Sequence, residues 1–194
     1  MSNKLISAAL AGDMLCVAVG TTASAQMNTM KVSTEKTVMV GGAAMYPSKN
    51  VIQNAVNSKD HTTLVAAVKA AGLVDTLSGP GPFTVFAPTN AAFGKLPAGT
   101  VDNLVKPENK PTLTKVLTYH VVAGRLSSAD LMAKVKAGGG KAKLATVEGE
   151  PLTVQSKAGA LWLWDAKGGA AKITIANVNQ SNGVIHVVDT VLMP

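Results

Sequence analysis

The sequence predicts an α+β domain, with helices concentrated in its N-terminal half and short strands in its C-terminal half. Apolar residues recur mainly at helical spacing before the Gly138-Gly139-Gly140 break, and five short apolar runs between glycine-rich turns follow it. A hydrophobic content of 47% is enough for a buried core, although only 4% of the residues are aromatic. Helices and strands segregated in this way favour a sheet or sandwich with helices on one side.

The predicted helices begin at residues that cap a helix N-terminus. Ser48 is expected to cap a first helix over 51–56, and Asp60 or Thr62 to start a second helix that Gly72 ends. Leu73 to Leu77 is expected to extend that second segment, and the same signals predict further helical segments at 90–93, 100–104, 111–117 and 128–135.

Strands are predicted where short apolar runs lie between glycines and prolines. The run Gly79-Pro80-Gly81-Pro82 is a firm break, and the residues after it, Phe83 to Ala87 with Phe86 among them, form a buried strand. Pro88 ends this strand, and Thr89 or Asn90 starts the short helix that carries Phe93 back to the core. The remaining predicted strands cover 119–122, 143–147, 152–155, 160–164, 172–177 and 184–191.

The last predicted strand follows a tight-turn signal. Asn182-Gly183 favours a two-residue hairpin loop, since both residues tolerate a positive φ. His186 lies among valines in the strand that follows, so it is either a buried structural group or part of a site. Asp189, three residues later, falls on the opposite face of the strand.

The N-terminus indicates export. Lys4, the apolar run 5–20 and the small residues 23–25 predict a signal peptide over 1–25, followed by a flexible leader over 26–46 and a single domain over 47–194. The apolar run is too short for a stable membrane span. The single cysteine, Cys16, lies in the signal, so the mature chain has no disulfide and no cysteine metal site. These features favour a periplasmic or extracellular bacterial protein.

The charge pattern argues against nucleic acid as a partner. The formal net charge is +7, but the lysines are spread out and Arg125 is the single arginine. Nucleic-acid readers depend on arginine forks and stacking aromatics, and both are scarce here. We therefore expect a solvated, mildly basic surface, with attraction to acidic envelope polymers or anionic lipid head groups as the alternative.

Three stretches resemble the fasciclin domain family: Phe83–Pro97, Val116–Leu126 and Ala176–Pro194. Their order and spacing fit one complete domain, and the resemblance implies a sandwich or wedge of short strands with a helical layer from the N-terminal half. In animal members a tyrosine–histidine pair within aliphatic residues is linked to adhesion, which makes Tyr119 and His120 candidate binding residues. The alternative is that His120 is a hydrogen-bonded anchor, and the same interpretation is favoured for His186.

No catalytic or metal-binding constellation is evident in the sequence. His120 and His186 are half of a metal site at most, because no carboxylate lies at ligand spacing from either. No serine has the context of a nucleophile elbow, and no glycine-rich phosphate loop is present. We therefore expect neither a cofactor nor an enzymatic activity.

Trp162 and Trp164 lie two residues apart, so they share one face of their predicted strand. If Leu161 and Leu163 face the core, the tryptophans form an exposed strip able to stack on a sugar ring, an aromatic partner or a polyene. In the other arrangement the tryptophans fill the core. The sequence leaves both arrangements open.

The sequence favours an exported, non-catalytic adhesion module that binds a surface protein or a polysaccharide. The alternative is a carrier of an apolar small molecule such as a carotenoid or lipid, with Trp162 and Trp164 in or near its groove. The resemblance implies this second function, since some fasciclin-like proteins from algae bind carotenoids.

Overall fold

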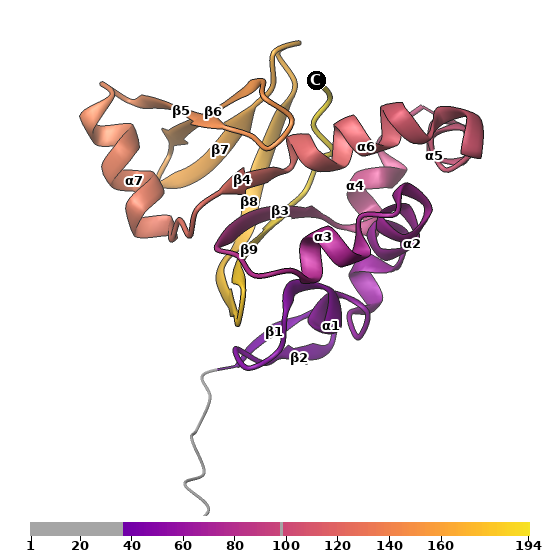
Figure 1. Cartoon of the computed structure of the whole chain (residues 1–194). Helices are drawn as coiled ribbons and strands as arrows, with labels where there is room; N and C mark the ends of the chain where they lie inside the picture. Colours follow the sequence, from indigo (N-terminus) through magenta and orange to yellow (C-terminus); the bar gives the residue numbers. More distant parts are fainter. Residues whose placement is uncertain (1–36, 98) are drawn as a thin grey trace, which may run out of the picture. The chain divides into compact units, whose positions relative to one another are not determined.

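Helices precede most of the strands in the computed structural model, which describes residues 37–97 and 99–194 (Figure 1). No helix in this part of the chain is both long and apolar enough to cross a membrane. The helices are α1 (Val51–Ala55), η1 (Lys59–His61), α2 (Thr62–Ala71), α3 (Val74–Ser78), α4 (Asn90–Gly94), α5 (Thr100–Leu104), η2 (Pro107–Asn109), α6 (Lys110–Tyr119) and α7 (Ser128–Ala137). The strands are β1 (Val38–Val40), β2 (Ala43–Met45), β3 (Phe83–Pro88), β4 (Val121–Ala123), β5 (Lys141–Ala145), β6 (Pro151–Lys157), β7 (Ala160–Trp164), β8 (Ala170–Gln180) and β9 (Gly183–Val188).

Within the described residues the main sheet has seven strands, in the order β4-β3-β9-β8-β7-β6-β5. β3 and β9 run parallel, while every other neighbouring pair is antiparallel. The sheet curls until its edge strand β4 meets the residues that follow β5 at the other edge. There Thr146 forms a β-bridge with Val122, and the Val147 N–H donates to the Val121 carbonyl at 2.8 Å. The curl gives β5–β8 an inner face that lines a core and an outer face turned away from it.

Strands β3 and β9 separate two apolar clusters. Successive residues of a strand point to opposite faces, so Ile185 and Val187 join one cluster while Phe86 and Val188 join the other. The first cluster includes Phe93 of α4 and packs β3 and β9 against the N-terminal helices. The second lies between α7 and strands β4–β8. The predicted α+β class is confirmed, but the expectation of helices on one side is wrong, because α7 packs on a different face from α1–α3 (Figure 1).

Helix caps agree with the sequence at α4 and differ at α1. The Thr89 hydroxyl accepts a hydrogen bond from the Ala92 N–H, so Thr89 starts α4 directly after β3. At α1 the cap is Asn50 and not Ser48, because Asn50 and Gln53 form a reciprocal capping box. The first helix begins at Val51 as predicted and ends one residue early, since Val56 is its C-cap.

The expected leader over 26–46 contains regular structure in the part that can be described. β1 and β2 form an antiparallel hairpin in which Val38 faces Met45 and Val40 faces Ala43. Val40 and Met45 are 2% and 3% exposed and belong to the first cluster. The expectation of flexibility is thus wrong for 38–45, whereas the predicted signal peptide and residues 26–36 lie outside the described residues.

The predicted strand over 119–122 begins two residues later than expected. Tyr119 is the last residue of α6 and His120 is its C-cap, so the first two residues of the predicted strand belong to the end of the helix. Strand β4 then occupies Val121–Ala123 at the edge of the main sheet.

The turn between β8 and β9 forms where predicted, but for a different physical reason. Gln180 pairs with Gly183, so the loop residues are Ser181 and Asn182. Neither Asn182 nor Gly183 has a positive φ, and that part of the sequence argument is wrong. Gly183 is required because a Cβ at this position would overlap the carbonyl of Phe83 in neighbouring β3.

Candidate functional site

The outer face of β7 carries both tryptophans of the chain. Leu161 and Leu163 are 7% and 0% exposed and fill the second core cluster. Trp162 and Trp164 point to the opposite face and are half-buried. Of the two arrangements that the sequence leaves open, the structure therefore has the one with leucines inside and tryptophans outside.

Two rows of side chains cross this outer face from strand to strand. In the first row Trp162 lies between Gln155 of β6 and Lys172 of β8, and Lys141 of β5 faces Gln155 from the other side. All four residues share one face, because directly paired residues of neighbouring strands point the same way.

The second row runs two residues further along the strands. Trp164 lies between Thr153 and Ala170, and Lys143 follows Thr153 on β5. A surface hollow of about 420 Å³ lies between the two rows and is lined by Lys141, Ala142, Lys143, Thr153, Gln155 and Trp164. Aromatic, cationic and neutral polar groups thus meet on one surface, which we call the tryptophan face: Lys141, Lys143, Thr153, Gln155, Lys157, Trp162, Trp164 and Lys172.

Tyr119 and His120, the other predicted binding pair, are buried. Tyr119 is 0% exposed, and its hydroxyl donates to the Pro151 carbonyl at 3.4 Å. His120 is 3% exposed, its Nδ1–H donates to the Val116 carbonyl at 2.7 Å, and its Nε2 accepts from the Leu192 N–H at 3.1 Å. Burial raises the pKa of Tyr119 and lowers the pKa of His120. A partner that docks on the folded surface cannot reach either side chain.

His186 joins β9 to the loop before α7. Its Nε2–H donates to the Leu126 carbonyl at 2.9 Å, and its Nδ1 accepts from the Asn177 N–H at 3.4 Å. The ring stacks on Phe86, with centroids 5.7 Å apart, and burial lowers its pKa. These contacts are those of the structural anchor that the sequence favours.

His61 is a third buried histidine, and no sequence pattern assigns it a role. Its Nδ1 lies 2.9 Å from the Ser58 hydroxyl, whereas Nε2 is the one buried side-chain polar atom without a partner within the described residues. Burial lowers its pKa, against a smaller opposing effect of the Ala87 carbonyl. Among residues 37–97 and 99–194, no three His, Cys, Asp or Glu side chains gather in one place.

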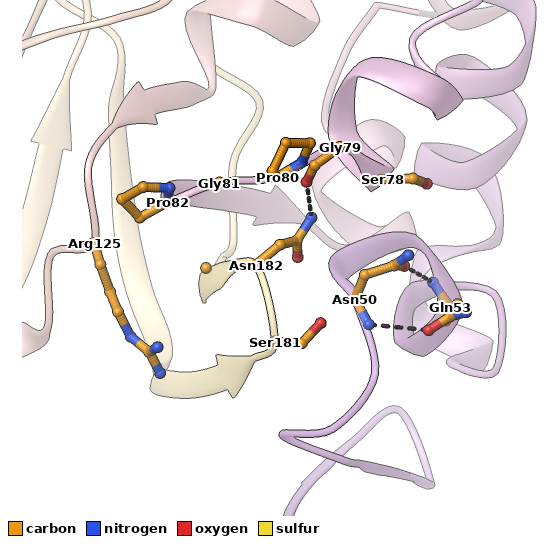
Figure 2. Close-up of a pocket in the computed structure, with 11 residues that line it drawn as sticks. Asn50, Gln53, Ser78, Gly79, Pro80, Gly81, Pro82, Arg125, Ser181 and Asn182 are labelled. Carbon is orange, nitrogen blue, oxygen red and sulfur yellow. Dashed lines mark hydrogen bonds between the residues drawn. The ribbon is translucent and has the colours of Figure 1, made fainter.

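A polar pocket of about 500 Å³ lies where the β8–β9 turn meets the segment before β3 and the start of α1 (Figure 2). The Asn182 side chain makes three hydrogen bonds at this pocket. Its side-chain N–H groups donate to the carbonyls of Leu77 and Gly79 at 2.8 and 3.0 Å, and its oxygen accepts from the Val51 N–H at 3.1 Å.

Three further polar side chains of this pocket also bond to the protein. Asn50 and Gln53 bond each other, as the dashed lines of Figure 2 show. Arg125 donates to the Asn179 side-chain oxygen at 3.0 Å. The pocket therefore holds three segments together, and it is a weaker candidate for ligand binding than the tryptophan face.

The apolar cavities inside the domain are small. One of about 30 Å³ lies between α1–α3 and strand β3, and a second of about 20 Å³ lies beneath the β1–β2 hairpin. Ligand pockets in proteins usually measure about 300–1,000 Å³, whereas these two have room for about one water molecule each.

The lysines of the tryptophan face are the residues that the sequence argument missed. Each strand shows an alternation of residues facing in and out, as in Lys141-Ala142-Lys143-Leu144. This alternation within one strand does not reveal how neighbouring strands pair. The pairing register places Lys141 and Lys172 in the same row as Trp162.

Comparisons with known proteins found a matching family model, similar curated proteins and a solved structure with the same fold. The family model described as Fasciclin domain matches residues 59–194. Protein sll1483 of Synechocystis sp. is 47% identical over 174 residues, which cover 90% of this chain and 87% of that protein. Cell surface glycolipoprotein MPB83 of Mycobacterium bovis is 38% identical over 160 residues, covering 80% of this chain and 64% of that protein. A solved structure of a FAS1 domain pair from the insect cell adhesion molecule Fasciclin I shares the fold, with a TM-score of 0.67 at 20% identity over 77% of this chain and 52% of that one.

Proposed function

The chain belongs to the fasciclin domain family, and we propose that it is an exported, non-catalytic recognition module that binds a partner at the cell envelope or in the surrounding matrix. The observation that carries this proposal is the tryptophan face. Two half-buried tryptophans on the outside of a sheet are a recognition surface, because their rings offer large apolar area at little conformational cost.

Separate observations support the two other parts of the proposal, export from the cell and the lack of a catalytic role. The predicted signal peptide favours export, and one relative is named as a cell surface glycolipoprotein. His120 and His186 use both ring nitrogens in hydrogen bonds to the backbone, so neither is free to move a proton for a substrate.

The test is binding of the purified chain to envelope fractions and secreted polymers of its native host. We expect saturable binding that Trp162→Ala weakens about tenfold or more, in line with the loss of a stacked aromatic anchor. Trp162→Phe, which keeps an aromatic ring, should retain more of the affinity. The control is Val56→Ala, since Val56 is an exposed apolar side chain at the C-cap of α1. Absence of saturable binding to every fraction would refute the proposal.

The second candidate function, a carrier of an apolar small molecule, has to use the same face. The cavities of about 30 and 20 Å³ are too small for a carotenoid or a lipid chain. A visible absorption band in protein isolated from the native host, lost in Trp162→Ala, would favour the carrier over the recognition module.

A further inference from the structure

We propose that the tryptophan face binds an acidic polysaccharide, a glycan chain whose residues carry carboxylate or sulfate groups. This inference rests on the proposed recognition function and adds the chemistry of the partner. It follows from the charge of the face, from the spacing of its rows and from its hollow.

The charge of the face is positive, and Asp189, the carboxylate that bonds the Lys172 N–H at its edge, is paired with Lys95. Four lysines point outward from β5, β6 and β8 and are exposed: Lys141, Lys143, Lys157 and Lys172. The remaining outward positions of β5–β7 and the start of β8 hold alanine, proline, threonine, glutamine and tryptophan, with no carboxylate. In the part of the chain that the structure describes, none of the four lysines is in an ion pair. A polyanion therefore meets free cations beside the aromatic rings.

The spacing of the first row suits a chain of sugar rings laid across the strands. Neighbouring strands lie about 4.8 Å apart, close to the length of one pyranose residue in a chain. Lys141 and Lys172 are three strand spacings apart, about 14 Å, with Gln155 and Trp162 between them. A trisaccharide in this direction places a ring against Trp162, hydroxyls near Gln155 and an acidic group near each lysine.

The hollow distinguishes a glycan from a membrane surface. Lys141, Lys143 and Trp164 border a depression of about 420 Å³ rather than a ridge. Aromatic side chains that anchor a protein to a bilayer must project into the interface. Here both tryptophans are half-buried within their rows. Trp164 lines the depression and Trp162 neighbours Gln155, which also lines it, so a chain can lie along the depression and beside Trp162.

The experiment titrates the full chain with oligomers of polygalacturonate and with dextran sulfate, following the fluorescence of Trp162 and Trp164. Fully methyl-esterified polygalacturonate and unsulfated dextran are the matched neutral probes. We expect binding of at least one acidic probe, a loss of about tenfold or more when the ionic strength rises from about 0.05 M to about 0.5 M, and no binding of its neutral counterpart.

Charge variants locate the site. Lys141→Gln with Lys172→Gln should weaken binding about tenfold, as expected for the loss of two exposed ion pairs. Lys134→Gln with Lys136→Gln removes the same charge from the last turn of α7 and should change the affinity less than about twofold.

Four results would overturn the inference. They are an equal loss in both double variants, equally tight binding of single-stranded DNA or of phosphatidylglycerol vesicles, saturable binding only to neutral glycans, and binding to envelope fractions that no acidic glycan competes away. The last two results would still be compatible with the recognition function. Absence of saturable binding to every envelope fraction would refute the recognition function itself.

Discussion

Trp162 and Lys172 are direct cross-strand partners on the outer face of β7 and β8. Because Trp162 and Trp164 are the two tryptophans of the chain, tryptophan emission, excited at wavelengths that tyrosine does not absorb, reports on this face alone. The lysines around them should concentrate anions near the rings. A local potential of about 0.4 kcal/mol per unit charge doubles the local anion concentration and halves the local cation concentration. When each ion is scaled to its quenching of free tryptophan, iodide should therefore quench about fourfold better than caesium at equal ionic strength.

The variants of the quenching experiment separate local from overall charge. Lys141→Gln with Lys172→Gln should bring iodide quenching close to that of caesium, while Lys134→Gln with Lys136→Gln should leave the difference intact. Equal quenching by the two ions in the unmodified chain would contradict the free lysines of the face.

Asn182 is predicted to contribute to stability well beyond its own turn. Its side chain makes three hydrogen bonds, to Val51, Leu77 and Gly79, which lie more than 100 residues away in the sequence. Asn182→Ala should lower the free energy of unfolding by about 2–4 kcal/mol, since three backbone groups lose their partner. Ser181→Ala, in the same loop and exposed, should cost less than about 0.5 kcal/mol. Urea unfolding of both variants measures the difference, and equal costs would assign the effect to the turn in general.

Local signals predicted the elements whose ends depend on neighbouring residues in the sequence. The helix over Thr100–Leu104 and the strand over Ala160–Trp164 have the predicted bounds. The cap at Thr89 is also confirmed, because the proline before it and the hydroxyl acceptor act within one helical turn. The fold class followed from the order of these elements.

Contacts distant in the sequence decided what local signals could not predict. Tyr119 belongs to α6 because β4 pairs with β3 only from Val121 onward, and periodicity cannot distinguish these two ends of one apolar run. Gly183 is fixed by the backbone of β3, and the rows of the tryptophan face by the pairing register of four strands. The tryptophans were therefore identified as candidates, while the lysines beside them were not.

Asn177 provides a test of backbone conformation at a β-bulge. Its φ is 60°, its side-chain oxygen accepts from the Ser128 N–H at 2.7 Å, and its amide donates to the Ser128 hydroxyl at 2.7 Å. Asn177→Gly loses both bonds but keeps the left-handed conformation at little cost, whereas Asn177→Ala loses the bonds and the conformation becomes strained. We expect Asn177→Ala to be less stable than Asn177→Gly by about 1 kcal/mol in thermal or urea unfolding. Equal stability would show that the bulge relaxes.

Three buried histidines should make the domain less stable in mild acid. His61, His120 and His186 are 2%, 3% and 0% exposed, and burial lowers the pKa of each. The unfolded chain takes up these protons at the ordinary pKa of about 6.5, whereas the folded chain takes them up only at a lower pH. The free energy of unfolding is therefore highest above about pH 6.5 and falls as the pH drops below it, by up to about 1.4 kcal/mol per pH unit for each histidine.

His61 is the histidine on which this pH dependence can be tested with the smallest loss of backbone contacts, since the Ala87 carbonyl affects its pKa but lies outside hydrogen-bonding geometry. Its Nε2 has no partner within the described residues, and the Ser58 hydroxyl that faces Nδ1 also donates to the Val40 carbonyl at 3.2 Å. His61→Leu should therefore change the free energy of unfolding at pH 8 by less than about 1.5 kcal/mol, as for other volume-conserving replacements. Below pH 6.5 its urea unfolding should depend less steeply on pH, by up to about 1.4 kcal/mol per unit, because one titrating group is gone. An unchanged slope would mean that His61 is already protonated in the folded chain or stays neutral in the unfolded one, and either result contradicts the lowered pKa.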